Sequence, residues 1–517
     1  MRAYQRRFLS NLTNLIMRHG DSASAAHRPS GEGVSRTISI VLLFSLGAIF
    51  ESTRLLSLRD AEIWGHLQVG DWILKNKCWP QFGLFSQATN LPWRDFNWGY
   101  DALAAVAYQL LGLRALPALL MGFRVALAGI TFLLAGGRRG NVWSAVALSA
   151  VAQYALFGIG PDAAFASAVL FGTELLLLLE SRRSGNYRLL FALPLLFLLW
   201  ANLDLGFVYG MGLYALFFAA LAVEKTAHIT NWNWVERPAT EIQLRTAALA
   251  GCACLVASAV TPYAYHGYAA FFAYESSAVN RYLPGYTAMS FHQPQDYVLL
   301  LLVMAAFFWL GVRRSRDVFL LGVLIGCVAL AFHAQRENWL ATLAAVAVIG
   351  ESILQRGQSV VVEGGLHWSM RTLATAGITI TLILLAFALR VPRERGVLME
   401  KIAESFPVRA CDFIRHQQLA APLFNSYEWG GFLTWYLPEY PVAIDGQRGL
   451  FPEEEELDYF KVMNAEVPYQ SYPPMNLART LLLNKQNVMG EALRGLPGFQ
   501  VMYEDHISIV LLQKENQ

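Results

Sequence analysis

Acidic, aromatic and imidazole side chains crowd into the stretch RDAEIWGHLQVGDWIL, residues 59–74, directly after the first long apolar segment of the chain. Asp60, Glu62, Trp64 and His66 stand there at alternate positions. A carboxylate can take the proton of an acceptor hydroxyl when partial burial tunes its pKa, and an imidazole can donate a hydrogen bond to a phosphate. Charged residues can also simply mark the end of a helix. Because Trp64 and His66 lie close by in the sequence, we favour the chemical role for the two acids.

The geometry expected for the two acids depends on the backbone. On one helix, Asp60 and Glu62 would lie on different faces, because side chains two residues apart do not face each other. In an extended turn, both carboxylates could point into one cleft.

Polar side chains also separate the apolar segments farther along the chain. The loop HAQREN holds Arg336, whose guanidinium would suit a lipid-linked phosphate. His66 and His333 could donate to such a phosphate or be ordinary polar residues of an interface. Ionisable groups at membrane depth are costly and usually functional, so loops that converge on one face predict a cleft. The other candidates for this cleft are Asn202, Asp204 and Tyr263.

The elements that position these residues follow from the composition. Of the 517 residues, 55% are hydrophobic and only 15% are charged, against about a quarter charged in soluble proteins. The apolar residues form long runs, which predict an α-helical polytopic membrane protein. The net charge of +2 gives no indication of nucleic acid or another acidic partner.

About eleven apolar segments approach the length of about 17–25 residues that spans a bilayer. They are residues 37–57, 115–135, 141–158, 162–180, 187–203, 205–223, 246–262, 296–312, 317–333, 339–354 and 372–390. The segment 98–113 is shorter and interrupted, and we expect an interfacial helix there.

Basic residues predict the orientation of this domain, residues 37–390. Arginine and lysine clusters fall in alternate loops, on the same side as the basic tail 1–36, which the positive-inside rule makes cytoplasmic. The first outer loop is then 58–100, and an odd number of spans puts the C-terminus outside. Three arginines that follow the last span, Arg390, Arg393 and Arg395, count against this orientation. The tail itself predicts either a surface helix or a disordered segment.

The composition changes after residue 391, and residues 391–517 predict a small α/β soluble domain on the outer side. Two runs, 421–424 and 441–445, are typical of strands, and the aromatic stretch between them is compatible with a helix. The sequence GFQVMYEDHISIVLLQK predicts a hairpin that turns at EDH. Five cysteines show no metal-binding spacing, and a disulfide between Cys78 and Cys411 stays open.

Two glycine-containing motifs in this domain, SYEWGGFLTW and AIDGQRG, predict a loop that faces a ligand and caps the cleft. Asp445 and Arg448 would be its polar residues. The alternative is that Gly430 and Gly431 only allow a tight backbone turn.

The stretch DAEIWGHLQVGDWILKNKCWPQFGLFSQATNLPWRDFNW resembles the first outer loop of polytopic bacterial proteins related to the GT-C glycosyltransferases. Further similar stretches are WANLDLGF, TPYAYHGY, HAQREN, FNSYEWGGFLTWYL and VAIDGQR. Three positions depart from the family pattern. Asn202-Leu203-Asp204-Leu205 replaces Asn-x-His-Gly, Gly160-Pro161 replaces Arg-Pro, and Arg281-Tyr282 replaces an acidic-Trp pair.

The resemblance implies a GT-C-like enzyme of the bacterial inner membrane that moves a sugar from a polyprenyl-(di)phosphate donor to an acceptor on the extracytoplasmic face, with inversion. It implies Asp60 as the favoured base, Glu62 as the second acid, and His66 and Arg336 at the lipid phosphate. Trp64, His333, Asn202, Asp204 and Tyr263 are the further substrate-binding candidates. No cofactor is implied, and a divalent cation is not indicated. The alternative is a non-catalytic GT-C-like scaffold subunit of an envelope polysaccharide assembly system.

Overall fold

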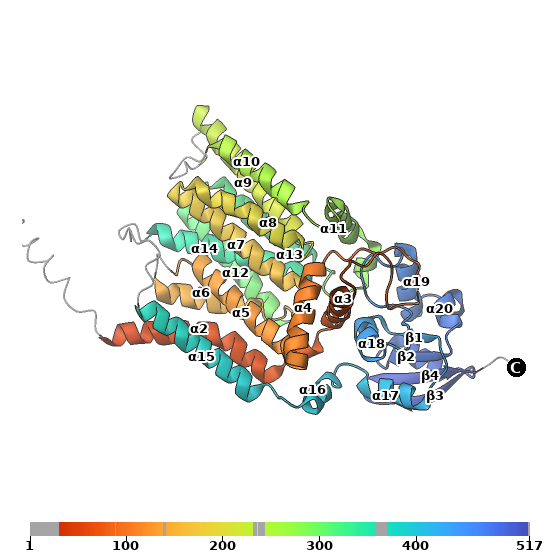
Figure 1. The fold of residues 1–517 in the computed structure, drawn as a ribbon. Helices are drawn as coiled ribbons and strands as arrows, with labels where there is room; N and C mark the ends of the chain where they lie inside the picture. The colour runs from red at the N-terminus through yellow and green to blue at the C-terminus, as the bar shows by residue number, and fades with distance from the viewer. Residues whose placement is uncertain are drawn as a thin grey trace, which may run out of the picture.

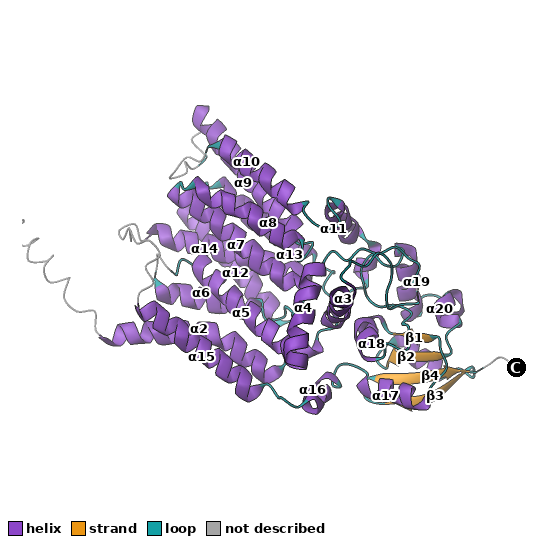
Figure 2. Cartoon of the chain, in the orientation of Figure 1, coloured by secondary structure: helices purple, strands orange, loops and turns teal. Residues whose placement is uncertain are grey.

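The computed structural model describes residues 30–87, 89–137, 141–230, 235, 243–356 and 370–514. Long helices form a bundle, and a small domain with a sheet is attached at one end of it (Figures 1 and 2). Residues 1–29 of the basic tail, for which a surface helix and a disordered segment both stay open, lie outside the described residues. The first helix already begins at Ser30, within the predicted tail.

Each of the eleven predicted spans coincides with a helix. These helices are α2 (Ser30–Arg54), α5 (Ala115–Leu134), α6 (Val142–Ala155), α7 (Ala163–Ser184), α8 (Leu193–Ala201), α9 (Phe207–Ile229), α10 (Leu244–Ser258), α12 (Pro294–Arg313), α13 (Val318–His333), α14 (Asn338–Arg356) and α15 (Met370–Arg390). In the described part of the chain, six helical segments are long and apolar enough to cross a membrane, and a bent pair, Ala374–Arg390 with Arg395–Ile402, makes a seventh. The chain is therefore a multi-pass membrane protein. The count of eleven stays a prediction, because four of the apolar helices have only 10–17 residues.

Helix α14 forms the core of the bundle. Its residues from Trp339 to Ile349 are all buried, and many of them are alanines. Small side chains let neighbouring helix backbones approach closely, which is how helices associate where lipid gives no hydrophobic drive. Helices α5, α6, α7, α12 and α13 pack against it.

Polar groups mark the two ends of the bundle. At one end, Arg182 of α7 forms ion pairs with Glu224 of α9 at 2.9 Å and with Asp317 at 3.0 Å. The opposite ends of α7 and α9 meet the linker between α13 and α14, where Arg336 lies. The loops predicted to share one side therefore do converge at one end. Which side of the membrane this end faces stays a prediction.

The first outer loop contains more regular structure than we expected. A 3₁₀ turn, η1 (Leu56–Arg59), is followed by the helix α3 (Glu62–Asn76), an irregular segment, and α4 (Trp98–Leu111). Asp60 is extended, with φ −74° and ψ 132°, and Glu62 is the first residue of α3. The expected interfacial segment is thus a helix, α4, which the 3₁₀ turn η2 (Gly112–Arg114) joins to α5, and its place at the interface stays a prediction.

The C-terminal domain holds a four-stranded sheet of order β1-β2-β4-β3. Its elements are α16 (Arg395–Ile402), α17 (Val408–Gln417), β1 (Leu423–Asn425), α18 (Gly430–Tyr436), α19 (Glu453–Met463), α20 (Pro473–Asn476), β2 (Thr480–Asn484), α21 (Val488–Arg494), β3 (Phe499–Glu504) and β4 (Ser508–Gln513). Strand β1 pairs with β2 in parallel, and the other pairs are antiparallel.

Most of the local predictions for this domain are confirmed. The β3–β4 hairpin turns at Asp505–Ile507, and the aromatic stretch is the helix α18. The run 441–445 was wrongly predicted as a strand: it makes only an isolated bridge, between Val442 and Ser86. Cys78 is exposed and Cys411 is buried, and both thiols are free.

The helices of the first loop and the C-terminal domain share one hydrophobic cluster, which includes Trp64, Tyr100, Phe406 and Phe432. Helix α18 crosses α3 where two glycines meet: a Cβ on Gly431 would lie 3.0 Å from the backbone nitrogen of Gly65. The paired glycines therefore serve close backbone packing, not the tight turn that we considered.

Candidate active site

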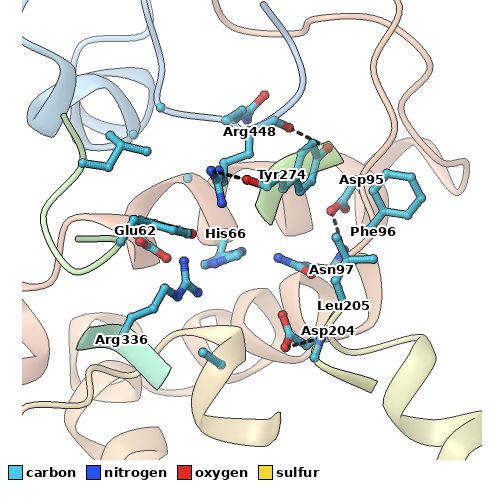
Figure 3. A pocket seen from close by; sticks show the side chains of 18 of the residues that line it. Glu62, His66, Asp95, Phe96, Asn97, Asp204, Leu205, Tyr274, Arg336 and Arg448 are labelled. Atoms are coloured by element: carbon cyan, nitrogen blue, oxygen red, sulfur yellow. Dashed lines mark hydrogen bonds between the residues drawn. The ribbon is translucent and has the colours of Figure 1, made fainter. Parts of the chain in front are cut away.

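A cavity of about 400 Å³ lies where the first loop, the bundle and the C-terminal domain meet. Its wall combines the N-terminal ends of α3, α4, α7 and α9, the helix α11 (His266–Ser276), the 336–339 segment and the turn 445–448. Figure 3 shows Glu62 and His66 of α3, Arg336 and Arg448 turned toward one space. The charged residues that line it are Glu62, His66, Arg94, Asp95, Asp101, Asp204, Glu275, Arg336, Glu337, Glu428, Asp445 and Arg448.

Of the two acids in the first loop, Glu62 lines this cavity and Asp60 stands behind it. Oδ1 of Asp60 accepts hydrogen bonds from the backbone N–H groups of Glu62 and Ile63, at 3.0 and 3.1 Å, and so caps the start of α3. Burial and the negative charge of Glu62 raise the pKa of Asp60 to about 6. Its other oxygen packs against Gly160, where no Cβ could fit. The departure from an Arg-Pro pair at Gly160 therefore makes room for this carboxylate.

His66 is held by an acid at the start of α4. Nδ1 of His66 lies 2.6 Å from Oδ1 of Asp101, and both side chains are largely buried. Burial lowers the pKa of His66, but the nearby carboxylates, led by Asp101, outweigh it and raise the pKa to about 10. The ring is therefore a cation at neutral pH. Burial and the charge of Asp101 also raise the pKa of Asp95 well above its usual range.

Two guanidinium groups enter the cavity from different parts of the chain. Arg336 follows α13, and its Nε lies 3.5 Å from Oε1 of Glu337. Arg448 belongs to the C-terminal domain and donates hydrogen bonds to the carbonyl of Tyr274, at 3.4 Å, and to the side chain of Asn280. Burial and the positive charge of Arg336 lower the pKa of Arg448. The ring of Tyr286 lies beside both, 4.4 Å from Arg336 and 4.2 Å from Arg448.

Asp204 lines the cavity but is engaged in hydrogen bonds within the protein. Its Oδ2 accepts from the hydroxyl of Ser167 and from the backbone N–H of Gly206, the latter at 2.9 Å. Trp200 donates in turn to Oγ of Ser167 at 2.6 Å. These contacts fix the turn that joins α8 to α9.

Besides Asp60, four predicted site residues do not line the cavity. Trp64 is fully buried, and its ring lies 4.7 Å from that of Trp435. Asn202 accepts a hydrogen bond from Nε1 of Trp98 at 3.1 Å and holds α4 against the α8–α9 turn. Tyr263 stacks edge to face on Phe96, which itself lines the cavity. His333 is exposed at the end of α13.

Other cavity residues were missing from the predicted site. Asp95 lies in the first loop and Asp101 in the first turn of α4, and no local sequence pattern distinguishes either from the other acids of the chain. Tyr286 belongs to the loop before α12, and only its contacts with the two arginines identify it. Over the described residues, no three His, Cys, Asp or Glu side chains are placed to hold a metal ion.

Comparisons with known proteins bear on the fold. No protein-family model matches the sequence, and no curated protein matches it either. The apo crystal structure of the Archaeoglobus fulgidus oligosaccharyltransferase aligns with a TM-score of 0.51 at 12% identity, over 87% of this chain and 69% of that one. ArnT from Cupriavidus metallidurans aligns with a TM-score of 0.47 at 14% identity. The coverage of this chain and of ArnT is 92% and 98% for the structure bound to undecaprenyl phosphate, and 91% and 97% for the apo structure. The likeness to the oligosaccharyltransferase shows that the chain shares the fold of that protein, in agreement with the resemblance of its sequence to the GT-C glycosyltransferases.

Proposed function

We propose that the protein is a membrane glycosyltransferase that moves a sugar from a polyprenyl-(di)phosphate donor to an acceptor on the extracytoplasmic face. One observation carries the proposal: a carboxylate, Glu62, shares a single cavity with two guanidinium groups, those of Arg336 and Arg448. Such a cavity offers a base for the acceptor and positive charge for the leaving phosphate. It also opens between a membrane bundle and a soluble domain, where a lipid-linked donor can meet a water-borne acceptor.

The reaction would be a single displacement at the anomeric carbon. Glu62 takes the proton of an acceptor hydroxyl as its oxygen bonds to that carbon, and the bond from the carbon to the lipid phosphate breaks. The phosphate leaves with the electron pair, and Arg336 and Arg448 stabilise its growing negative charge. Because the acceptor attacks from the side opposite the phosphate, the anomeric configuration inverts.

Glu62 fits the role of base better than Asp60 does. Its carboxylate lines the cavity, whereas Asp60 lies behind it and accepts two backbone hydrogen bonds. Asp60 then acts on Glu62 through its charge. His66, cationic because of Asp101, is a third positive group for the phosphate.

The direct test measures donor consumption by the full-length protein in proteoliposomes. The probes are undecaprenyl phosphates that carry glucose, galactose or mannose, with water or an envelope extract as the acceptor. The wild type should release undecaprenyl phosphate from at least one of them, and Glu62→Gln should not. The control Glu491→Gln changes an exposed acid of α21 and should behave as the wild type. Equal donor consumption by Glu62→Gln and the wild type would overturn the assignment.

A non-catalytic scaffold subunit of an envelope polysaccharide assembly system is the second candidate. It is favoured by Asp204, which replaces the histidine of the related motif and is already hydrogen-bonded to Ser167 and Gly206. A scaffold would bind the lipid probes without consuming any of them, even with envelope extract present.

The orientation in a bacterial inner membrane belongs to the same proposal, with the N-terminus cytoplasmic and the C-terminus outside. A phosphatase reporter fused after Gln517 should be active only outside the cytoplasm. Activity of a cytoplasmic reporter at that position would reverse the orientation and remove the cavity from the outer face.

A further inference from the structure

The C-terminal domain contributes a second kind of chemistry to the cavity, at the turn that follows Ile444. Asp445 lines the cavity and is 2% exposed. Its Oδ1 accepts a hydrogen bond from the backbone N–H of Gln447 at 3.0 Å, while its Oδ2 has no hydrogen-bond partner in the described part of the chain. Gly446, between them, has a φ of 76°, which only glycine adopts without strain. The turn is thus built to hold one oxygen fixed and to leave the other unpaired.

The position of this turn is fixed from behind. A Cβ on Gly430 would lie 2.6 Å from Cα of Asp445, so the first residue of α18 and the turn are in direct backbone contact. Asn425 accepts hydrogen bonds from the N–H groups of Ala443 and Ile444, at 2.9 and 3.4 Å. A carboxylate on such a support has little freedom to find a partner by moving.

Among the described residues, no cation pairs with the Asp445 carboxylate. Burial raises the pKa of Asp445 to about 7, and only backbone hydrogen bonds act in the other direction. Arg448, three residues on, points instead to Tyr274 and Asn280. A buried acceptor without a partner in the protein is costly, so such an atom calls for a donor from outside the protein, which a bound ligand can supply.

The other orphan atoms of the cavity are of the same kind. Among the described residues that line it, the buried side-chain atoms without a hydrogen-bond partner are all oxygens: Asp95 Oδ2, Asn97 Oδ1, Glu337 Oε2, Asp445 Oδ2 and Gln447 Oε1. Aromatic rings line the same space, among them Trp93, Tyr274 and Tyr286. Acceptor oxygens between flat apolar rings complement a molecule with several hydroxyl groups on a ring with apolar C–H faces, which is the chemistry of a saccharide.

We infer that Asp445 and Gln447 form a saccharide-reading edge of the cavity, in which their side-chain oxygens accept hydrogen bonds from ring hydroxyls. The inference rests on the proposed function and deepens it, because it assigns sugar recognition to the C-terminal domain. The ring can belong to the donor or to the acceptor, since both would expose hydroxyl groups here. Asp445 and Gln447 would position the ring, and the chemistry would stay with Glu62.

The test compares binding by the full-length protein in nanodiscs. Asp445→Asn keeps Oδ1 for the N–H of Gln447 but places an amide donor where Oδ2 stands. Gln447→Leu removes the second acceptor and serves if Asp445→Asn does not fold, because Gln447 is only half-buried. The control Asp458→Asn changes an exposed acid of the same domain that pairs with Lys461. The probes are undecaprenyl phosphate, undecaprenyl phosphates that carry glucose, galactose or mannose, and methyl glycosides of the same sugars.

A charge-assisted hydrogen bond predicts a loss of about tenfold to a hundredfold in affinity. If the ring belongs to the donor, Asp445→Asn and Gln447→Leu weaken the binding of the sugar-bearing lipids and leave the binding of undecaprenyl phosphate unchanged. If the ring belongs to the acceptor, the two variants bind the methyl glycosides more weakly and bind all the lipids as the wild type does. Asp458→Asn should match the wild type.

Two results would overturn the inference: equal affinities of the wild type and both variants for every sugar probe, or a wild type that binds none of them. Catalysis is judged separately. A wild type that binds sugar probes but never consumes a donor refutes the glycosyltransferase, while the comparison of Asp445→Asn with the wild type still decides the role of Asp445.

Discussion

The guanidinium groups of Arg336 and Arg448 lie over the ring of one residue, Tyr286, with their central carbons 4.4 and 4.2 Å from its centroid. Arg336 comes from the helix bundle and Arg448 from the C-terminal domain, more than a hundred residues away. Figure 3 shows both side chains turned into the cavity. Like charges so placed repel each other, and an anion between them would relieve the repulsion.

We therefore expect Arg336→Ala and Arg448→Ala each to weaken the binding of undecaprenyl phosphate by about tenfold to a hundredfold, the range of a hydrogen bond to a charged group. The two losses should not add in the double variant, because both arginines would contact one phosphate. Binding to nanodiscs that contain the full-length protein measures this without any knowledge of the sugar. Arg494→Ala, at an exposed position of α21, is the control. Unchanged affinity in both single variants would remove the phosphate from this part of the cavity.

Replacement of the two acids of the first loop should separate their roles. Glu62→Gln should lower turnover by about a hundred- to ten-thousand-fold, the usual loss of a general base, with donor affinity retained. Asp60→Asn keeps an oxygen to accept the N–H groups of Glu62 and Ile63, so the cap of α3 survives and only a charge is lost. Asp60→Asn should therefore lower turnover much less than Glu62→Gln does. The reverse pattern, with Asp60→Asn silent and Glu62→Gln active, would make Asp60 the base.

The positions of the helices could be predicted from the sequence because the length of an apolar run is a local signal. All eleven predicted segments are helical, and the β3–β4 hairpin turns where the sequence predicts. The run 441–445 failed as a strand because its partner is decided by tertiary packing: Val442 bridges to Ser86 of the first loop. Strand β2 was missed for the same reason, since its pairing with β1 joins residues that are far apart in the sequence.

The site was predictable only in part. Glu62, His66, Asp204 and Arg336 were identified from their residue types and their places between apolar segments, and all four line the cavity. Trp64 has the same sequence signal but is a core residue, because an aromatic ring suits a buried cluster as well as a ligand. Asp101 and Tyr286 are recognised as site residues only by their contacts, with His66 and with the two arginines respectively. No local sequence pattern encodes such contacts.

The pair of His66 and Asp101 predicts how stability depends on pH. The pKa of His66 is about 10 in the folded protein, against 6.5 for the free side chain. The folded state thus binds the proton more tightly, so the stabilisation is fully present below about pH 6.5 and is lost as the pH rises through about 10. The thermal midpoint of the wild type should exceed that of His66→Gln at pH 6, and the difference should shrink by pH 10.

A matched control for that experiment is His506→Gln, at an exposed position in the β3–β4 turn. The difference between its thermal midpoint and that of the wild type should stay constant over the whole pH range. If the difference between His66→Gln and the wild type is also constant with pH, the imidazole is not held as a cation by Asp101.

The crossing of α3 and α18 yields a last prediction, on how the C-terminal domain is held over the cavity. Gly431 and Gly396 are each the second residue of a short helix, so glycine-to-alanine changes at both should stabilise the helix itself by about 0.5–1 kcal/mol. The two positions differ in the room for a methyl group. A Cβ on Gly431 would lie 3.0 Å from the backbone nitrogen of Gly65, whereas nothing lies within 4 Å of a Cβ on Gly396. Gly431→Ala should therefore push α18 away from α3, lower the thermal midpoint and weaken donor binding, because the 445–448 turn moves with α18. Gly396→Ala should raise the midpoint slightly and leave binding unchanged. If the two variants stabilise the protein alike and bind undecaprenyl phosphate as the wild type does, close contact at Gly65 does not hold the domain over the cavity.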